Sequence, residues 1–130
     1  MTVTSMKSAS NHRELVAWQE AVRLVEMIYR KTADFPKEEA FGLTAQLRRT
    51  AVSIPSNIAE GAGRNSSREL AQFLGVASGS RAELDTQLFI AVRLGLIEAE
   101  SEIITQLERV GRLLTALRRS IQARTEAANV

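Results

Sequence analysis

The spacing of apolar residues along the chain predicts four helices. In residues 12–34, apolar positions recur at steps of three and four, which is the repeat of one helical face. These positions are Leu15, Trp18, Val22, Val25 and Tyr29. Phe35 and Pro36 end this first helix, because the residue before a proline is pushed out of the α conformation.

The second predicted helix begins between Lys37 and Thr44 and carries Pro55 near its middle. Its apolar positions keep one phase on both sides of the proline: Leu43, Leu47, Ala51, Ile54 and Ile58. Because proline removes one backbone hydrogen bond, the segment is either two short helices broken near Ser53 or one kinked helix. The unbroken phase favours one kinked helix. We expect it to end at Gly61, Gly63 and Asn65.

Two more helices follow. The third opens at Ser66 with a serine-to-glutamate capping pattern that reaches Glu69, and Gly95 closes it. Its apolar stripe consists of Leu70, Phe73, Ala77, Leu84, Leu88 and Ala91. The fourth has Ser101 as its N-cap and a strict four-three alternation typical of a coiled-coil seam. That seam consists of Ile103, Leu107, Val110, Leu114, Leu117 and Ile121.

The helical pattern fixes the expected fold class. No segment alternates with a period of two, and the connections are short. We therefore predict an all-α, antiparallel up-down-up-down four-helix bundle with its second helix kinked at Pro55. The bundle is expected over residues 12–123, between a disordered tail at residues 1–11 and a fraying tail at residues 124–130.

Length and composition narrow the class of protein. A chain of 130 residues is most simply one domain, and it contains no cysteine, which excludes disulfides and thiolate metal sites. Its first residues lack the apolar segment of a secretory signal, and no run is long enough to span a membrane. We expect a cytoplasmic protein without a membrane partner.

Apolar residues also lie off the predicted core stripes. On the first helix they are Val16, Leu24 and Met27; on the second, Ala45, Val52 and Ala59; on the third, Val76, Phe89 and Ile90. Contiguous exposed apolar patches mark partner surfaces. We therefore predict a homo-oligomer whose interface includes Val16, Leu24, Met27, Ala45, Val52 and Ala59.

The charge is mildly basic and is carried mostly by arginine. Seventeen Lys and Arg residues oppose fifteen Asp and Glu residues, a formal charge of +2, and only three of the basic residues are lysines. Arg48 and Arg49 are adjacent on the second predicted helix. They suit either salt bridges or bidentate contacts to phosphate, and the pattern leaves both open. On the fourth helix, Arg109, Arg112 and Arg119 share one face, where Glu108 can pair with Arg112. A solvated face is the simpler interpretation there, and a stripe that follows a nucleic-acid backbone is the alternative.

No catalytic or cofactor site is expected. His12 is the only histidine, and carboxylates such as Glu60, Glu69, Glu83 and Asp85 suit capping and surface roles better than acid–base catalysis. The glycines from Gly61 to Gly63 begin like a dinucleotide motif, but they follow a helix and the third glycine is missing. The next helix N-terminus, beside Arg64 and Arg68, remains a weaker phosphate candidate. We expect a protein that is not an enzyme and that uses no cofactor or metal.

Several motifs appear in an order that resembles a known family. They include Leu15-x-x-Trp18, then Phe35-Pro36-Lys37, the block FGLTAQLRRTAVSIPSNIAEG from Phe41, Ser67-x-Glu69-Leu70 and Gly79-Ser80. The set is similar to the bacterial four-helix-bundle proteins encoded in 23S rRNA intervening sequences. It covers the first three helices closely and the fourth by pattern only.

The resemblance implies a homopentamer shaped as an open ring or barrel. The family is also similar to the accessory variability proteins of diversity-generating retroelements, basic pentamers that bind nucleic acid and a reverse transcriptase. Arg48, Arg49 and Arg64 match the family's basic pattern, whereas the near-balanced charge departs from its more basic members. We expect binding to nucleic acid, structured RNA above all, through Arg48, Arg49, Arg64 and Arg68. The alternative is an oligomeric scaffold that docks a protein partner.

Overall fold

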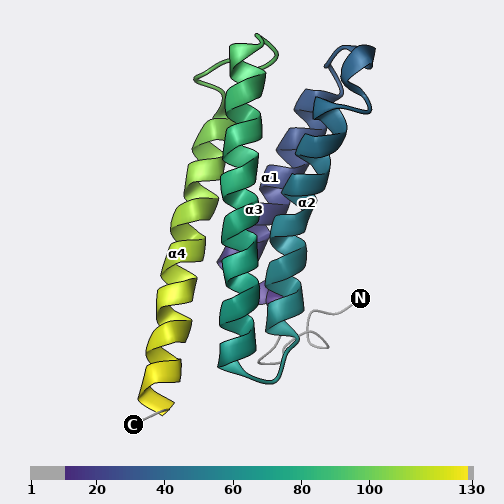
Figure 1. Ribbon diagram of the computed structural model, residues 1–130. Coiled ribbons are helices and arrows are strands. Elements are labelled where there is room, and N and C mark those ends of the chain that lie inside the picture. Colours follow the sequence, from purple (N-terminus) through teal and green to yellow (C-terminus); the bar gives the residue numbers. More distant parts are fainter. Residues whose placement is uncertain (1–10, 129–130) are drawn as a thin grey trace.

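Four long helices form an up-down bundle. The computed structural model describes residues 11–128, so the predicted N-terminal tail lies outside the described residues except for Asn11. The helices are α1 (Val16–Thr32), α2 (Leu43–Ala62), α3 (Ser67–Arg93) and α4 (Glu102–Ala128), which run alternately in opposite directions (Figure 1). The short 3-10 turns η2 (His12–Glu14) and η3 (Lys37–Glu39) precede α1 and α2. Contacts join consecutive helices, and α4 also contacts α1. The predicted fold class is confirmed.

The buried face of α1 differs from the predicted one. Its buried apolar residues are Ala17, Ala21, Leu24 and Ile28, whereas the predicted stripe lies on the flank, where Leu15, Trp18 and Val25 are only partly buried. The buried set and the predicted set both follow a helical period. The prediction chose the flanking set because its side chains are larger than Ala17 and Ala21. The alanines face the centre because α1 contacts both α2 and α4, and small residues allow close approach. His12 packs edge-on against the Trp18 ring.

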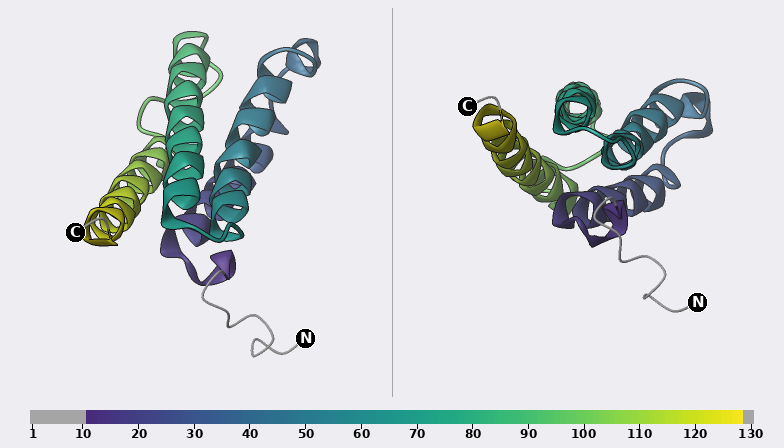
Figure 2. Two further views of the ribbon diagram at one scale, coloured as in Figure 1. Left: turned by 60° about the horizontal axis from the view of Figure 1, so that its bottom comes forward. Right: turned by 90° about the horizontal axis from the view of Figure 1, so that it is seen from below.

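The second helix is continuous through Pro55, as the unbroken apolar phase predicted. Leu47, Ala51, Ile54 and Ile58 are all fully buried. The prediction for Gly61 was wrong, because this residue lies inside α2, which continues to Ala62. A Cβ atom at Gly61 would lie 2.8 Å from the Cβ of Phe73 on α3. The glycine therefore lets the lower ends of α2 and α3 approach closely, and the two helices diverge toward the opposite end (Figure 2).

The caps of the last two helices are as predicted. Ser66 Oγ accepts a hydrogen bond from the Glu69 backbone N–H, and Ser101 Oγ accepts one from that of Ile103. Gly95, with φ of 76°, follows the end of α3 in the left-handed conformation that glycine favours. The α4 seam is buried apart from the partly exposed Leu117.

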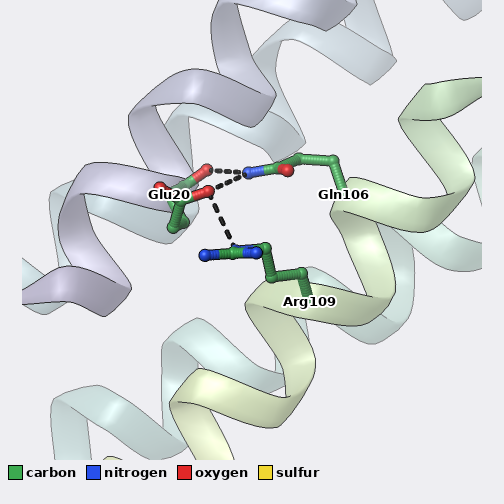
Figure 3. Close-up of polar contacts among 3 residues, drawn as sticks. All are labelled: Glu20, Gln106 and Arg109. Carbon is green, nitrogen blue, oxygen red and sulfur yellow. Dashed lines mark hydrogen bonds and ion pairs between the residues drawn. The ribbon is translucent and has the colours of Figure 1, made fainter.

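Three polar side chains join the first helix to the last. Gln106 on α4 donates from Nε2 to the backbone oxygen of Glu20 at 2.9 Å and to its Oε1 at 3.0 Å. Arg109 Nε lies 3.1 Å from the same carboxylate oxygen (Figure 3). Gln106 is buried, so these bonds satisfy a polar group that would otherwise be costly inside the bundle.

Candidate nucleic-acid interface

The four predicted arginines do not form one site. Arg48 of α2 forms hydrogen bonds to the C-terminal end of α1. Its Nε donates to Thr32 Oγ1 at 2.9 Å, and its Nη2 donates to the Tyr29 backbone oxygen at 3.3 Å. Its guanidinium also lies 4.5 Å from the centre of the Tyr29 ring. A cation beside the last carbonyls of a helix stabilises that end. Arg48 is thus occupied by contacts within the bundle.

The other three predicted arginines have different surroundings. Arg64 forms a surface ion pair with Glu60 at 3.0 Å and lies over the Phe73 ring. Arg49 lines a groove between α2 and α3, and Arg68 lies at the lower end of the seam between α3 and α4. Only Arg68 therefore lies close to the larger arginine cluster of the molecule.

That cluster lines an open groove of about 630 Å³ between α3 and α4, which we call the arginine groove. Its basic side chains are Arg81, Arg112, Arg118 and Arg119, and its one acidic side chain is Glu108. Arg81 comes from α3 and the other three from α4, so two adjacent helices supply the charge. Arg81 and Arg118 are half-buried, which limits the positions that their guanidinium groups can adopt.

The arginine groove concentrates positive charge. Four guanidinium groups against one carboxylate give a local formal charge of +3, which exceeds the +2 of the whole chain. Within residues 11–128, none of the four arginines forms an ion pair or a side-chain hydrogen bond. Guanidinium groups without partners are available for bidentate contacts to an anion.

Two arginines in the groove cross from one helix to the other over a glycine. Arg81 lies against Gly111 of α4, and Arg118 of α4 lies near Gly75 of α3. The two crossings are six residues apart on α3, or about 9 Å at 1.5 Å per residue. Thirteen residues, or about 20 Å along α3, separate Arg68 from Arg81, and the hollow that Arg68 lines also contains Glu126.

The sequence identified part of this groove. Arg112 and Arg119 were expected on one face of the fourth helix, and both line the groove. Arg109 turns to Glu20 on α1 instead, and Glu108 forms no ion pair with Arg112 among the described residues. Arg81 and Arg118 were missed, because their meeting depends on how α3 and α4 pack.

The predicted oligomer interface is only partly exposed in the single chain. Leu24 was wrongly assigned to it, because Leu24 is 0% exposed and belongs to the core. Met27 is half-buried against that core, while Val16 and Val52 are exposed. Ala45 and Ala59 are half-buried on α2. The face that remains available is therefore mainly that of α2, with Val16 separate at the start of α1.

The described residues contain neither a membrane-spanning helix nor a metal-binding cluster. No helix in this part of the chain is long and apolar enough to cross a membrane. Residues 11–128 contain no group of three or more His, Cys, Asp or Glu side chains placed to hold a metal ion.

Comparison with known proteins identifies the family. The sequence model of the 23S rRNA-intervening sequence protein family matches residues 13–116, and the chain belongs to this family. The match extends from η2 into α4 and includes Arg81, Gly111 and Arg112 of the arginine groove. No curated protein matches the sequence significantly.

Proposed function

We propose that this family member is a non-catalytic, cytoplasmic, homo-oligomeric protein that binds the phosphate backbone of structured RNA in its arginine groove. The observation that carries the proposal is the gathering of Arg81, Arg112, Arg118 and Arg119, without partners among the described residues, along one seam. The family is named for proteins of 23S rRNA intervening sequences, and on that genetic association we choose structured RNA as the ligand.

The shape and chemistry of the groove suit a backbone more than a small molecule. The groove is open to solvent, whereas small-molecule sites enclose most of their ligand. Arginine presents a planar fork that matches two phosphate oxygens, and such contacts do not depend on base sequence. Glu108, the one acidic side chain of the groove, disfavours a phosphate directly beside it.

Oligomerisation is supported by groups on the outer side of α2 and α3. Val52 is 39% exposed on α2, and the groove beside it contains Arg49 and Glu83, neither of which has an ion-pair partner in the described part of the chain. Gln87 is buried in the same groove, and its Oε1 accepts no hydrogen bond from any described residue. A second subunit seated here would cover the apolar surface and supply partners for these polar groups.

A ring would strengthen the interaction with RNA. Five copies, the number that the family resemblance implies, would carry a formal charge of five times +2, or +10. Repeated grooves would contact one RNA at several points, and linked contacts bind far more tightly than separate ones.

An interaction scaffold is the second candidate. Large apolar side chains are exposed toward the end of the bundle where α3 gives way to α4: Phe41, Phe89, Ile90 and Leu94. A protein partner that buries them would bind with little dependence on salt, in contrast to a phosphate backbone.

Fluorescence anisotropy with a structured RNA hairpin, repeated across a salt series, tests the proposal. Affinity should fall steeply with salt, and Arg112→Ala/Arg119→Ala should lower both the affinity and the slope, by about 0.7 to 0.9 per lost phosphate contact. Arg23→Ala/Arg30→Ala removes the same charge from exposed positions on α1 and serves as the matched control. Equal losses in the two double variants would show that net charge, rather than the groove, holds the RNA. Absence of binding by the folded wild-type protein at low salt would favour the scaffold.

A further inference from the structure

Gly111 is an unexpected residue in the middle of α4. Glycine is one of the least favourable residues inside a helix, because it fixes a very flexible backbone and packs no side chain. The only described glycine with positive φ is Gly95, so Gly111 is not required by its backbone conformation. A close approach of helix backbones does not explain it either. The three atoms nearest to a Cβ built there all belong to the side chain of Arg81.

The three glycines of α3 and α4 form a graded series. A Cβ on Gly111 would lie 3.0 Å from both Cδ and Nε of Arg81 and 3.2 Å from its Cζ. On Gly75 it would lie 3.7 Å from Nη2 of Arg118, an ordinary van der Waals distance. On Gly79 it would meet nothing within 4 Å. Only at position 111, therefore, would a Cβ enter the space that an arginine side chain fills.

We infer that Gly111 is a positioning residue, which provides the flat surface on which Arg81 lies across α4 with its guanidinium group in the arginine groove. This inference rests on the proposed function. Arg81 is half-buried and forms no hydrogen bond or ion pair among residues 11–128 that would hold it. Contact with the bare α4 backbone is thus what orients it. An arginine held in place before binding loses less side-chain freedom when it meets a phosphate.

A methyl group at position 111 should therefore affect stability and binding in opposite directions. Alanine favours the helix, and the long side chain of Arg81 can swing toward solvent at little cost to the fold. Its guanidinium group would then leave the groove, and one phosphate contact would weaken. A glycine that only served the packing of the bundle would instead lose stability when replaced.

The test compares Gly111→Ala with Gly75→Ala and Gly79→Ala in thermal unfolding and in RNA anisotropy. We expect all three variants to melt at or above the wild-type temperature, and only Gly111→Ala to bind RNA more weakly, by about three- to tenfold, with a lower salt slope. Arg81→Ala should cause a similar loss, and adding Gly111→Ala to it should cause no further loss, because the two changes remove one contact. Unchanged binding by Gly111→Ala, or additive losses in the double variant, would overturn the inference.

A second measurement does not depend on RNA. The NMR signal of the Arg81 Nε–H group can be assigned because it disappears in Arg81→Lys. This group should be ordered in the wild-type protein and in Gly79→Ala, but mobile in Gly111→Ala. If wild-type protein fails to bind RNA and the Arg81 signal still shows this pattern, the proposed function fails and the positioning role stands. Equal mobility of Arg81 in the wild type and in Gly111→Ala would refute the positioning role, whatever the RNA result.

Discussion

Arg48 and Arg49 are neighbours in the sequence, and the structure gives them different roles. Arg48 is half-buried and bonds to Thr32 Oγ1 and the Tyr29 backbone oxygen, whereas Arg49 is exposed and has no partner in the described part of the chain. We predict that Arg48→Ala destabilises the bundle and leaves RNA affinity nearly unchanged once the protein is folded. Arg23→Ala, which removes the same charge from an exposed position on α1, should leave stability unchanged and is the matched control.

The magnitude follows from the contacts that Arg48 would lose. A hydrogen bond contributes about 0.5 to 1.5 kcal/mol, a partly exposed cation–π contact about 0.5 to 1, and a cation at a helix C-terminus about 0.3 to 1. Thr32 Oγ1 would keep its own bond to the Ile28 backbone oxygen, so no buried donor is left without a partner. These ranges add to roughly 2 to 5 kcal/mol, and because Arg48 is partly exposed we expect a loss at the lower end, about 2 kcal/mol. With an unfolding entropy of roughly 2.1 cal/mol/K per residue, this corresponds to a Tm lower by about 7 °C.

Urea and thermal unfolding followed by circular dichroism measure this loss, at one protein concentration for all variants because assembly also shifts stability. Arg48→Lys should recover only part of it, because lysine lacks the fork that reaches two acceptors. If Arg48→Ala matches wild-type stability and loses RNA affinity instead, Arg48 is a phosphate ligand and its assignment to the end of α1 is wrong.

Three further changes test the packing and the assembly. Gly61→Ala should lower the free energy of unfolding by about 1 to 2 kcal/mol in urea titrations, because the new Cβ would crowd Phe73; a more stable variant would contradict the close approach. Gln106→Leu keeps the side-chain volume but removes both hydrogen bonds to Glu20, and it should lower the free energy of unfolding by about 1 kcal/mol in the same titrations. Wild-type stability in this variant would mean that these bonds contribute nothing. Val52→Asp should yield folded monomers in light scattering, since it buries a charge at the proposed subunit contact; an oligomer of unchanged mass would place the interface elsewhere.

The sequence predicted the helices correctly where a single buried apolar face determines the spacing of the apolar residues. The seam of α4 and the stripe of α2 across Pro55 were predicted correctly, because each helix carries one continuous apolar face. The core face of α1 was not, because Ala17 and Ala21 are small and give a weaker signal than the larger residues on the flank. Leu24 was therefore assigned to an outer surface, although it is at the centre of the bundle.

The candidate site was less accessible because it depends on contacts between helices. Sequence identifies which arginines exist, but not which of them find partners. Arg48 and Arg109 are used within the bundle by groups 16 or more residues away, at Thr32 and Glu20. Arg81 joins the groove only because α3 packs beside α4 and Gly111 leaves space for its side chain. The apolar repeat of α3 or of α4, taken alone, does not indicate that Arg81 meets Gly111.

Site-specific photo-crosslinking tests the central claim most directly. A photoreactive residue at Thr115, an exposed position in the arginine groove, should crosslink to bound RNA at low salt and lose that crosslink as salt is raised. The same residue at Glu26, an exposed position on α1, is the matched control and should give little crosslinked product. Strong crosslinking at Thr115 alone would place the RNA in the groove. Equal crosslinking at both positions, or crosslinking at Glu26 alone, would contradict the account.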